Sequence, residues 1–341
     1  MDPSLRLSLA RLPTPIHLLR KTSQAMGKEI YLWRDDLTGF VESGNKIRKL
    51  EFLVADALAK GCDTLITCGG PQSNHTRSTA AVARELGMEV SILILPKPGF
   101  DRSADPTANL LLDEIFGAKL VWLDFDEFQK RGQGYAPYLT QEAEALKAQG
   151  KKPYVIPLGG SNPVGCLGYQ AAVEEMLPIW KDAAKTAAPD DLFCTLGTGG
   201  TFMGLRLGIE KQKLSTHLHG VNVIGPMSVT EGYVTQLTRD LEAKGVAFSP
   251  EGKFEMIDGY VGGGYAVASD DDLAFYSQFA REEGVLLDPC YTGKAFQGMI
   301  AEIRKNPSRF GNQILFLHSG GGFGTFAYTS QYRRVLLKRS V

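Results

Sequence analysis

The sequence contains few cysteines and none of the spacings that make cysteine structural. Five cysteines occur in 341 residues, and no two of them form a Cys-x-x-Cys pair. An odd number without such spacing predicts neither a disulfide framework nor a zinc site, so we expect no metal. Most of the five lie in apolar runs, which is typical of free buried thiols in a reducing compartment.

The chain also lacks an excess of charge of either sign. The chain has 37 Lys and Arg against 38 Asp and Glu, which leaves a net charge of -1. This balance gives no reason to expect nucleic acid or an anionic membrane as a partner. No apolar run reaches transmembrane length, and the N-terminus has no long apolar segment. We therefore expect a soluble cytoplasmic protein, although a chain whose targeting segment had been removed would look the same.

Internal repeats and low-complexity linkers are also missing, and the chain instead alternates short apolar runs with helical patterns. The runs that predict strands are 64–68, 90–95, 120–123, 154–158, 192–196, 221–224 and 314–317. The helical patterns lie near 76–86, 107–116, 140–148, 168–180, 202–211, 271–283 and 295–305. Apolar strands that are each followed by a helix predict parallel sheets covered on both faces, and hence an α/β fold. A chain of this length, with 43% hydrophobic residues, is long enough for two lobes with cores of their own.

Glycine-rich loops follow several of the predicted strands. The loop Gly197-Thr198-Gly199-Gly200-Thr201 lies between a strand and a helix. Its backbone N–H groups can converge on an anion, the helix dipole adds attraction, and two threonine hydroxyls add donors. The loop is neither a Walker loop nor a GxGxxG motif, and a flexible glycine turn would look similar. In this context we interpret it as a phosphate-binding cradle.

Lys46 lies in the segment Ser43-Gly44-Asn45-Lys46-Ile47-Arg48-Lys49-Leu50-Glu51, just before an amphipathic helix. The apolar stripe of that helix consists of Leu50, Leu53, Val54, Ala57 and Leu58. Gly61 stands where a left-handed residue commonly closes a helix. A lysine at such a helix start can serve as an imine-forming amine, although a single lysine there is more often simply solvated.

Polar side chains on other loops could complete a site around Lys46. The loop 70–75 offers amides and a hydroxyl that suit a carboxylate and a ring hydroxyl, although Ser73 or Asn74 could equally serve as a helix N-cap. Tyr265 lies in a second glycine-rich loop, and we expect His318 to be a packed, hydrogen-bonded histidine. A lysine, a phosphate cradle and hydroxyl donors on separate loops are what pyridoxal 5'-phosphate (PLP) requires.

With these motifs in place, the sequence resembles the fold type II (tryptophan synthase β-like) PLP enzymes, and within them the ACC deaminase/D-cysteine desulfhydrase family. The resemblance rests on GNKIRKLE (44–51), QSNHTR (72–77), GTGGT (197–201), LDPCYTGKA (287–295) and HSGG (318–321), and it extends over nearly the whole chain. It implies two α/β lobes with PLP between them. The large domain would comprise 1–49 and 157–341, and the small inserted domain 50–156. It also implies a homodimer.

The resemblance assigns roles to individual positions. The lysine matching Lys46 carries PLP as an imine, the position of Asn74 contacts the ring hydroxyl, and the position of Ser73 contacts the substrate carboxylate or takes part in proton transfer. The implied catalytic residues are Lys46, Ser73, Tyr265 and Tyr291. The implied cofactor-binding residues, besides Lys46, are Asn45, Asn74, Gly197, Thr198, Gly199, Gly200, Thr201, Thr292 and Ser319. The implied substrate-binding residues are Gln72, Ser73, Asn74, His75, Tyr265 and Tyr291.

Two positions distinguish the activities within this family. ACC deaminases carry Glu after the second tyrosine and Leu in the HLGG motif, whereas this chain has Thr292 and Ser319. Neutral hydroxyls resemble the D-cysteine desulfhydrase pattern, and a neutral group near the pyridine nitrogen gives a weaker electron sink than a carboxylate does. Such a sink is adequate for elimination of a thiolate. The chain departs from the family at Cys290, where Val is common, and at 322–324, both on the substrate side.

The predicted reaction is therefore α,β-elimination from D-cysteine to pyruvate, hydrogen sulfide and ammonia. L-cysteate sulfo-lyase and ACC deaminase activity are the alternatives within the family. The alternatives outside it are a PLP-binding protein without turnover and a nucleotide-binding module that uses the same glycine loops.

Overall fold

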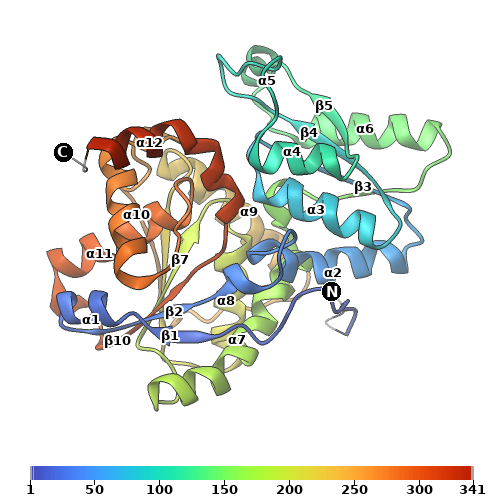
Figure 1. Cartoon of the computed structure of the whole chain (residues 1–341). Helices are drawn as coiled ribbons and strands as arrows, with labels where there is room; N and C mark the ends of the chain where they lie inside the picture. The colour runs from blue at the N-terminus through green and yellow to red at the C-terminus, as the bar shows by residue number, and fades with distance from the viewer. Residues whose placement is uncertain (1, 3, 339–341) are drawn as a thin grey trace.

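Two parallel sheets, one in each lobe, organise the chain (Figure 1). The computed structural model describes residue 2 and residues 4–338. The six strands of the larger sheet are, in spatial order, β1 (Ile16–Leu18), β2 (Glu29–Trp33), β10 (Gln313–Leu317), β7 (Asp191–Leu196), β8 (His217–Asn222) and β9 (Phe254–Ile257). The smaller sheet has the order β5 (Lys119–Trp122), β4 (Glu89–Ile94), β3 (Thr64–Gly69) and β6 (Pro153–Val155). All neighbouring strands are parallel except β1 and β2.

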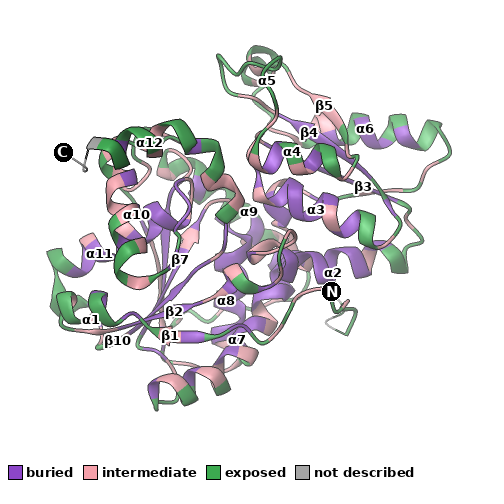
Figure 2. Cartoon of the chain, viewed as in Figure 1, coloured by how far each residue is buried: buried purple, intermediate pink, exposed green. Residues whose placement is uncertain are grey.

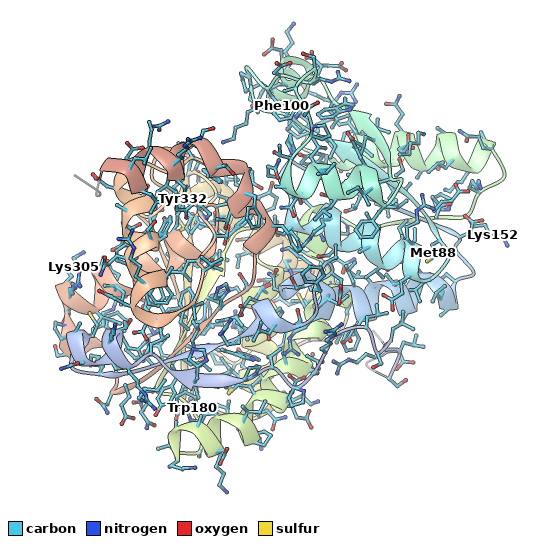
Figure 3. The ribbon with its side chains drawn as sticks, in the orientation of Figure 1. Met88, Phe100, Lys152, Trp180, Lys305 and Tyr332 are labelled. Carbon is cyan, nitrogen blue, oxygen red and sulfur yellow. The ribbon has the colours of Figure 1, made fainter. Side chains whose placement is uncertain are left out.

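The inner strands of both sheets are buried on both faces, which explains why most of them are apolar runs without alternation (Figure 2). The edge strands β5 and β6 of the smaller sheet are only partly buried. In β10, Leu315 and Leu317 belong to one core cluster, whereas Ile314 and Phe316 belong to another. Trp180 in the large lobe and Met88 in the small lobe, both labelled in Figure 3, lie in separate cores. The predicted α/β fold with two parallel-sheet lobes is confirmed.

Helices cover the sheets and connect successive strands. They are α1 (Arg20–Met26), α2 (Asn45–Ala59), α3 (Asn74–Glu85), α4 (Ala108–Ile115), α5 (Phe125–Arg131), α6 (Ala136–Ala148), α7 (Pro163–Ala184), α8 (Gly200–Lys211), α9 (Met227–Glu242), α10 (Asp270–Glu283), α11 (Thr292–Lys305) and α12 (Thr329–Lys338). Short 3₁₀ turns are η1 (Asp35–Leu37), η2 (Leu158–Gly160), η3 (Pro307–Arg309) and η4 (Gly322–Tyr328). Within the part of the chain that the structure describes, none of the helices combines the length and the apolar character needed to cross a membrane.

The small sheet takes all its strands from 64–155, within the segment 50–156 that was predicted to form the small domain. The exact division of the chain into domains stays a prediction. The stripe predicted for α2 is buried at Leu50, Leu53 and Val54, which are fully inaccessible. Leu58 was wrongly included, because it lies in the last turn of the helix and is 41% exposed.

A buried ion network ties the amino ends of β7, β8 and β9 together. His219 Nε2 lies 2.6 Å from Asp191 Oδ1, and its Nδ1 lies 2.5 Å from Glu255 Oε1. Arg309 pairs with the other oxygen of Glu255. Asp191, His217 and His219 also place possible ligand atoms within 4.8 Å of one another. Because both nitrogens of His219 already face carboxylates, ion pairing accounts for this cluster without a metal.

The network changes the pKa of two of its members in opposite directions. Burial lowers the pKa of His219, but the hydrogen bonds and charges of Asp191 and Glu255 outweigh it, so the pKa is raised above 6.5. The hydrogen bond to His219 lowers the pKa of Glu255 from 4.5 to about 2. At neutral pH the network therefore favours a charged Glu255 and a proton on His219.

The stability of the protein should depend on pH through this network. The contribution of His219 is complete below about pH 6.5 and is lost as the pH rises through its raised pKa. The contribution of Glu255 is complete above about pH 4.5 and is lost as the pH falls towards 2. Urea unfolding from about pH 5 to about pH 9 should therefore show an alkaline decline in the free energy of unfolding that His219→Gln, which cannot titrate, lacks. An equal decline in the variant would contradict this assignment.

Candidate active site

Strands from both sheets end at one cavity of about 400 Å³, a volume typical of small-molecule sites. Residues at or just after the carboxyl ends of β3, β4, β7, β8 and β10 line it; they include Gly69, Leu95, Gly197, Ile224 and Ser319. Ligands of open parallel sheets bind at the carboxyl ends of the strands, because the connecting loops gather there. Here the loops of the two lobes face each other across the cavity.

The start of α2 places Lys46 in this cavity. Gly44 caps the helix with a φ of 103°, a conformation that favours glycine. A Cβ added at Gly44 would lie only 2.9 Å from the carbonyl oxygen of Ser319. The next backbone N–H, of Asn45, donates to that oxygen at 3.0 Å. The Gly-Asn-Lys sequence therefore lets the helix begin directly against the end of β10.

Arg48 fixes α2 to the large lobe, two residues after Lys46. Its Nε lies 2.7 Å from Asp35 Oδ2, and its Nη2 lies 2.8 Å from Glu175 Oε1. The hydroxyl of Tyr169 also donates to Asp35, at 2.6 Å. Arg48 and Asp35 are buried, and removing one partner of such a pair costs about 3–5 kcal/mol. This network holds the helix that carries Lys46 in place.

The amine of Lys46 has no hydrogen-bond partner among the residues that the structure describes. Burial lowers the pKa of Lys46 well below its usual value, and the nearby positive charge of Lys49 lowers it further. A lysine with a lowered pKa has a substantial neutral fraction, and the neutral amine is the form that attacks carbonyl groups and accepts protons.

The predicted phosphate cradle lies on the same cavity. Gly199 has a φ of 83° and caps α8. The first N–H of the helix, that of Gly200, donates to Ser161 Oγ at 3.2 Å, and the next N–H groups of the first turn remain for an anion. The hydroxyls of Ser161 and Thr198 lie 2.7 Å apart, and Asn45 Nδ2 donates to Thr201 Oγ1 at 2.9 Å. A phosphate fits this site by its chemistry, since backbone N–H groups, hydroxyls and a helix start converge on it.

Lys49 adds a positive charge to the cradle, which the sequence analysis missed. A Cβ added at Gly200 would lie 2.6 Å from Ser161 Oγ and 2.7 Å from Lys49 Nζ, so both groups are close to the cradle backbone. Burial lowers the pKa of Lys49 to about 8, so the side chain stays largely charged at neutral pH. The spacing of Lys46 and Lys49, three residues apart on one helix, was the available signal.

The loop after β3 supplies Ser73, Asn74 and His75 to the cavity. Ser73 is the N-cap of α3 and accepts the N–H groups of His75 and Thr76, each at 3.2 Å. Because both lone pairs of the hydroxyl are used, Ser73 can offer only its proton to a ligand. His75 and Thr195 line the cavity, but the Nδ1 of His75 and the hydroxyl of Thr195 are themselves buried and have no hydrogen-bond partner among the described residues.

Two predicted residues do not line the cavity. The amide of Gln72 is used by the backbone of the following segment, since its Nε2 donates to Thr107 O and its Oε1 accepts from Asn109 N, both at 3.0 Å. The hydroxyl of Thr292 lies 2.7 Å from Asp288 Oδ1, and Thr292 is fully buried. The structure therefore does not bring Gln72 and Thr292 to the cavity with the other predicted residues, and their expected contacts with substrate and cofactor stay predictions.

The remaining predicted residues are brought together. Tyr265 and Tyr291 place their hydroxyls 2.5 Å apart on the cavity wall. Burial raises the pKa of both tyrosines well above the usual value, so both keep their protons. The predicted residues that line the cavity are Asn45, Lys46, Ser73, Asn74, His75, Gly197, Thr198, Gly199, Gly200, Thr201, Tyr265, Tyr291 and Ser319.

His318 is packed as expected and lies beside the site without lining it. Its Nε2 donates to Leu286 O at 2.7 Å, and its Nδ1 accepts from Gly320 N at 3.2 Å. The carbonyl can only accept, so the Nε2 of His318 carries a proton when this hydrogen bond is formed. This histidine therefore shapes the turn after β10, and that turn presents Ser319 to the cavity.

Comparison with known proteins agrees with this geometry. Residues 7–320 match the family model described as pyridoxal-phosphate dependent enzyme, so the chain is a PLP-dependent enzyme. A Thermotoga maritima protein provisionally named 1-aminocyclopropane-1-carboxylate deaminase is 40% identical, over 97% of this chain and 100% of that protein. D-cysteine desulfhydrase of Klebsiella pneumoniae is 38% identical, over 95% of this chain and 96% of that protein.

A solved structure described as an ACC deaminase homologue has a TM-score of 0.82 at 34% identity, and the match covers 98% of this chain and 100% of that one. The chain belongs to the ACC deaminase/D-cysteine desulfhydrase family of fold type II PLP enzymes. Its cofactor is PLP.

Substitution of Gly200 tests the cradle. In Gly200→Ala the new methyl group must displace Ser161 Oγ or Lys49 Nζ, because each would be less than 3 Å away. Hydrogen bonds to a charged group are worth about 1.5–3 kcal/mol, so the PLP dissociation constant should rise roughly ten- to hundredfold. Gly232→Ala on α9, where nothing lies within 4 Å of the added Cβ, is the control. Unchanged PLP affinity in Gly200→Ala would remove this loop from the site.

Proposed function

We propose that this enzyme catalyses α,β-elimination from D-cysteine, in which D-cysteine and water give pyruvate, hydrogen sulfide and ammonia. The observation that carries the proposal is the absence of acid groups from the cavity. Among the residues that the structure describes, those lining the cavity include neither Asp nor Glu. Ser319, which has no side-chain partner among them, supplies the neutral hydroxyl at the end of β10.

Several residues around the cavity can be assigned a role in this reaction. Bound PLP supplies the electron sink that makes the α-proton of an amino acid removable. Lys46 Nζ, whose lowered pKa leaves it partly neutral, can accept a proton, whereas Ser73 cannot because its lone pairs are used. The charge of Lys49 and the cradle hold the phosphate.

The pair Tyr265 and Tyr291 can donate a hydrogen bond to the departing sulfur or to the substrate carboxylate. Both phenols keep their protons, because burial raises the pKa of Tyr265 and of Tyr291. One hydroxyl of the pair can donate to the other, which leaves a proton free to point at a ligand. A hydrogen bond from this hydroxyl can stabilise the negative charge on the departing sulfur, which leaves as hydrosulfide and is protonated in solution to hydrogen sulfide.

We also propose that the enzyme acts as a homodimer in the cytoplasm. Exposed apolar side chains such as Phe40 and Phe326, which are 68% and 63% exposed, support a subunit contact. Five free cysteines support a reducing compartment.

A substrate screen tests the proposed reaction. D-cysteine, L-cysteine, L-cysteate and ACC should be offered to the PLP-loaded enzyme, with release of pyruvate, 2-oxobutanoate and ammonia as readouts. We expect kcat/KM for D-cysteine to exceed that for ACC by at least about tenfold, because no carboxylate supports the pyridine nitrogen. Release of 2-oxobutanoate from ACC that is faster than release of pyruvate from D-cysteine would contradict the proposal. If L-cysteate were the best substrate, the elimination reaction would stand and only the proposed leaving group would be wrong.

Two variants of Ser319 provide the matched control. Ser319→Thr keeps the hydroxyl and should stay within a fewfold of the parent enzyme, whereas Ser319→Ala should lower kcat/KM for D-cysteine by roughly tenfold or more. Equal activity of the two variants would show that the hydroxyl does not take part.

A further inference from the structure

We propose that Asn109 is a positioning residue that fixes the side-chain amide of Asn74 so that its NH₂ group, and not its oxygen, faces the cavity. The proposal rests on the proposed function only in taking Asn74 as a contact of PLP. Asn109 lies at the start of α4, does not line the cavity and is fully buried. Nothing in the sequence around Asn109 marks this residue as part of the site.

A backbone carbonyl determines which way the amide of Asn109 points. Asn109 Nδ2 lies 3.0 Å from the carbonyl oxygen of Gln72. That oxygen can only accept, so Asn109 must present its NH₂ group on this side. The same nitrogen lies 3.0 Å from the side-chain oxygen of Asn74. Both protons of the Asn109 amide are therefore used, and the geometry leaves no choice of orientation.

The orientation of Asn74 follows from that of Asn109. Because Asn109 donates to Asn74 Oδ1, the oxygen of Asn74 is turned towards α4. The NH₂ group of Asn74 then remains for the cavity that the residue lines. A chain of hydrogen bonds thus extends from one backbone oxygen to an amide donor at the cofactor site.

The side chain of Gln72 holds this arrangement from the other side. Its Nε2 donates to Thr107 O, and its Oε1 accepts from Asn109 N. Between these two contacts, Ala108 has a φ of 52°, a conformation that is unusual for alanine and costs about 1–3 kcal/mol. Strain of this kind persists where the surrounding contacts over-determine the backbone, as they do here.

The consequence is chemical. An amide donor beside the hydroxyl-bearing carbon of the PLP ring stabilises the ring oxygen in its anionic form, whereas an amide oxygen there would repel it. Asn109 therefore sets which charge state of the ring oxygen the site favours, without touching the cofactor.

A double-mutant cycle tests the proposal with the apoenzyme and PLP, without substrate. Asn109→Ala should raise the PLP dissociation constant about five- to tenfold in the parent enzyme but less than about twofold in the Asn74→Ala background, because the two residues act as one unit. We expect Asn109→Ala, like Asn74→Ala, to shift the pH midpoint of the absorbance change of bound PLP to higher pH. Additive effects of the two substitutions would overturn the proposal.

Gln72→Ala is the matched control, because it loosens the same segment but leaves the Gln72 backbone oxygen in place. We expect this variant to keep the pH midpoint of the parent enzyme. A shift equal to that of Asn109→Ala would show that the effect comes from loosening of the loop, and the proposal would fail. Because no substrate is used, the result stands whichever amino acid the enzyme consumes.

Discussion

The half-buried amine of Lys46, which has no hydrogen-bond partner among the described residues, is the constraint on which the rest of the site depends. No carboxylate lines its cavity among the described residues, and the nearest ionic neighbour is a second lysine, Lys49. Desolvation by burial and, after it, the charge of Lys49 disfavour the charged form and lower the pKa of Lys46. Such an environment is costly for a lysine in general, but it is what an imine-forming lysine needs. The surrounding structure must therefore hold the Lys46 side chain in the cavity, because a lysine side chain otherwise favours solvent.

Three distant parts of the chain together meet that requirement. The end of β10 receives the start of α2 through the carbonyl of Ser319, and Arg48 binds the same helix to Asp35 and Glu175. The small lobe then closes the cavity with the loop after β3, whose Asn74 is oriented by Asn109. Lys46 lies in the first turn of α2 and the phosphate cradle at the start of α8, whereas the polar groups that would contact the PLP ring lie on the facing loop.

The sequence predicted the parts of the site that have a local signature. Lys46, the loop 197–201 and the apolar strands were recognised because helix starts, glycine loops and apolar runs are visible in short windows. The strands β1 and β9 were missed because they have only three and four residues and include polar ones. The strand β2 was missed although four of its five residues are apolar and buried, as in the predicted β10. Thr292 follows Tyr291 directly, but the first turn of α11 rotates it towards Asp288. Lys49 and Asn109 gain their roles from contacts across 110 and 35 residues, which no window of sequence contains.

Chemical trapping of the holoenzyme tests the central claim most directly. Borohydride reduction should fix PLP covalently to the lysine that carries it, and mass spectrometry of the peptides should then locate the label. The account predicts a label on Lys46, whose amine is partly neutral and free of hydrogen bonds among the described residues. Lys49 is the internal comparison, because it lines the same cavity but stays largely charged and donates to Gly159 O. A label on Lys49 in place of Lys46 would contradict the account.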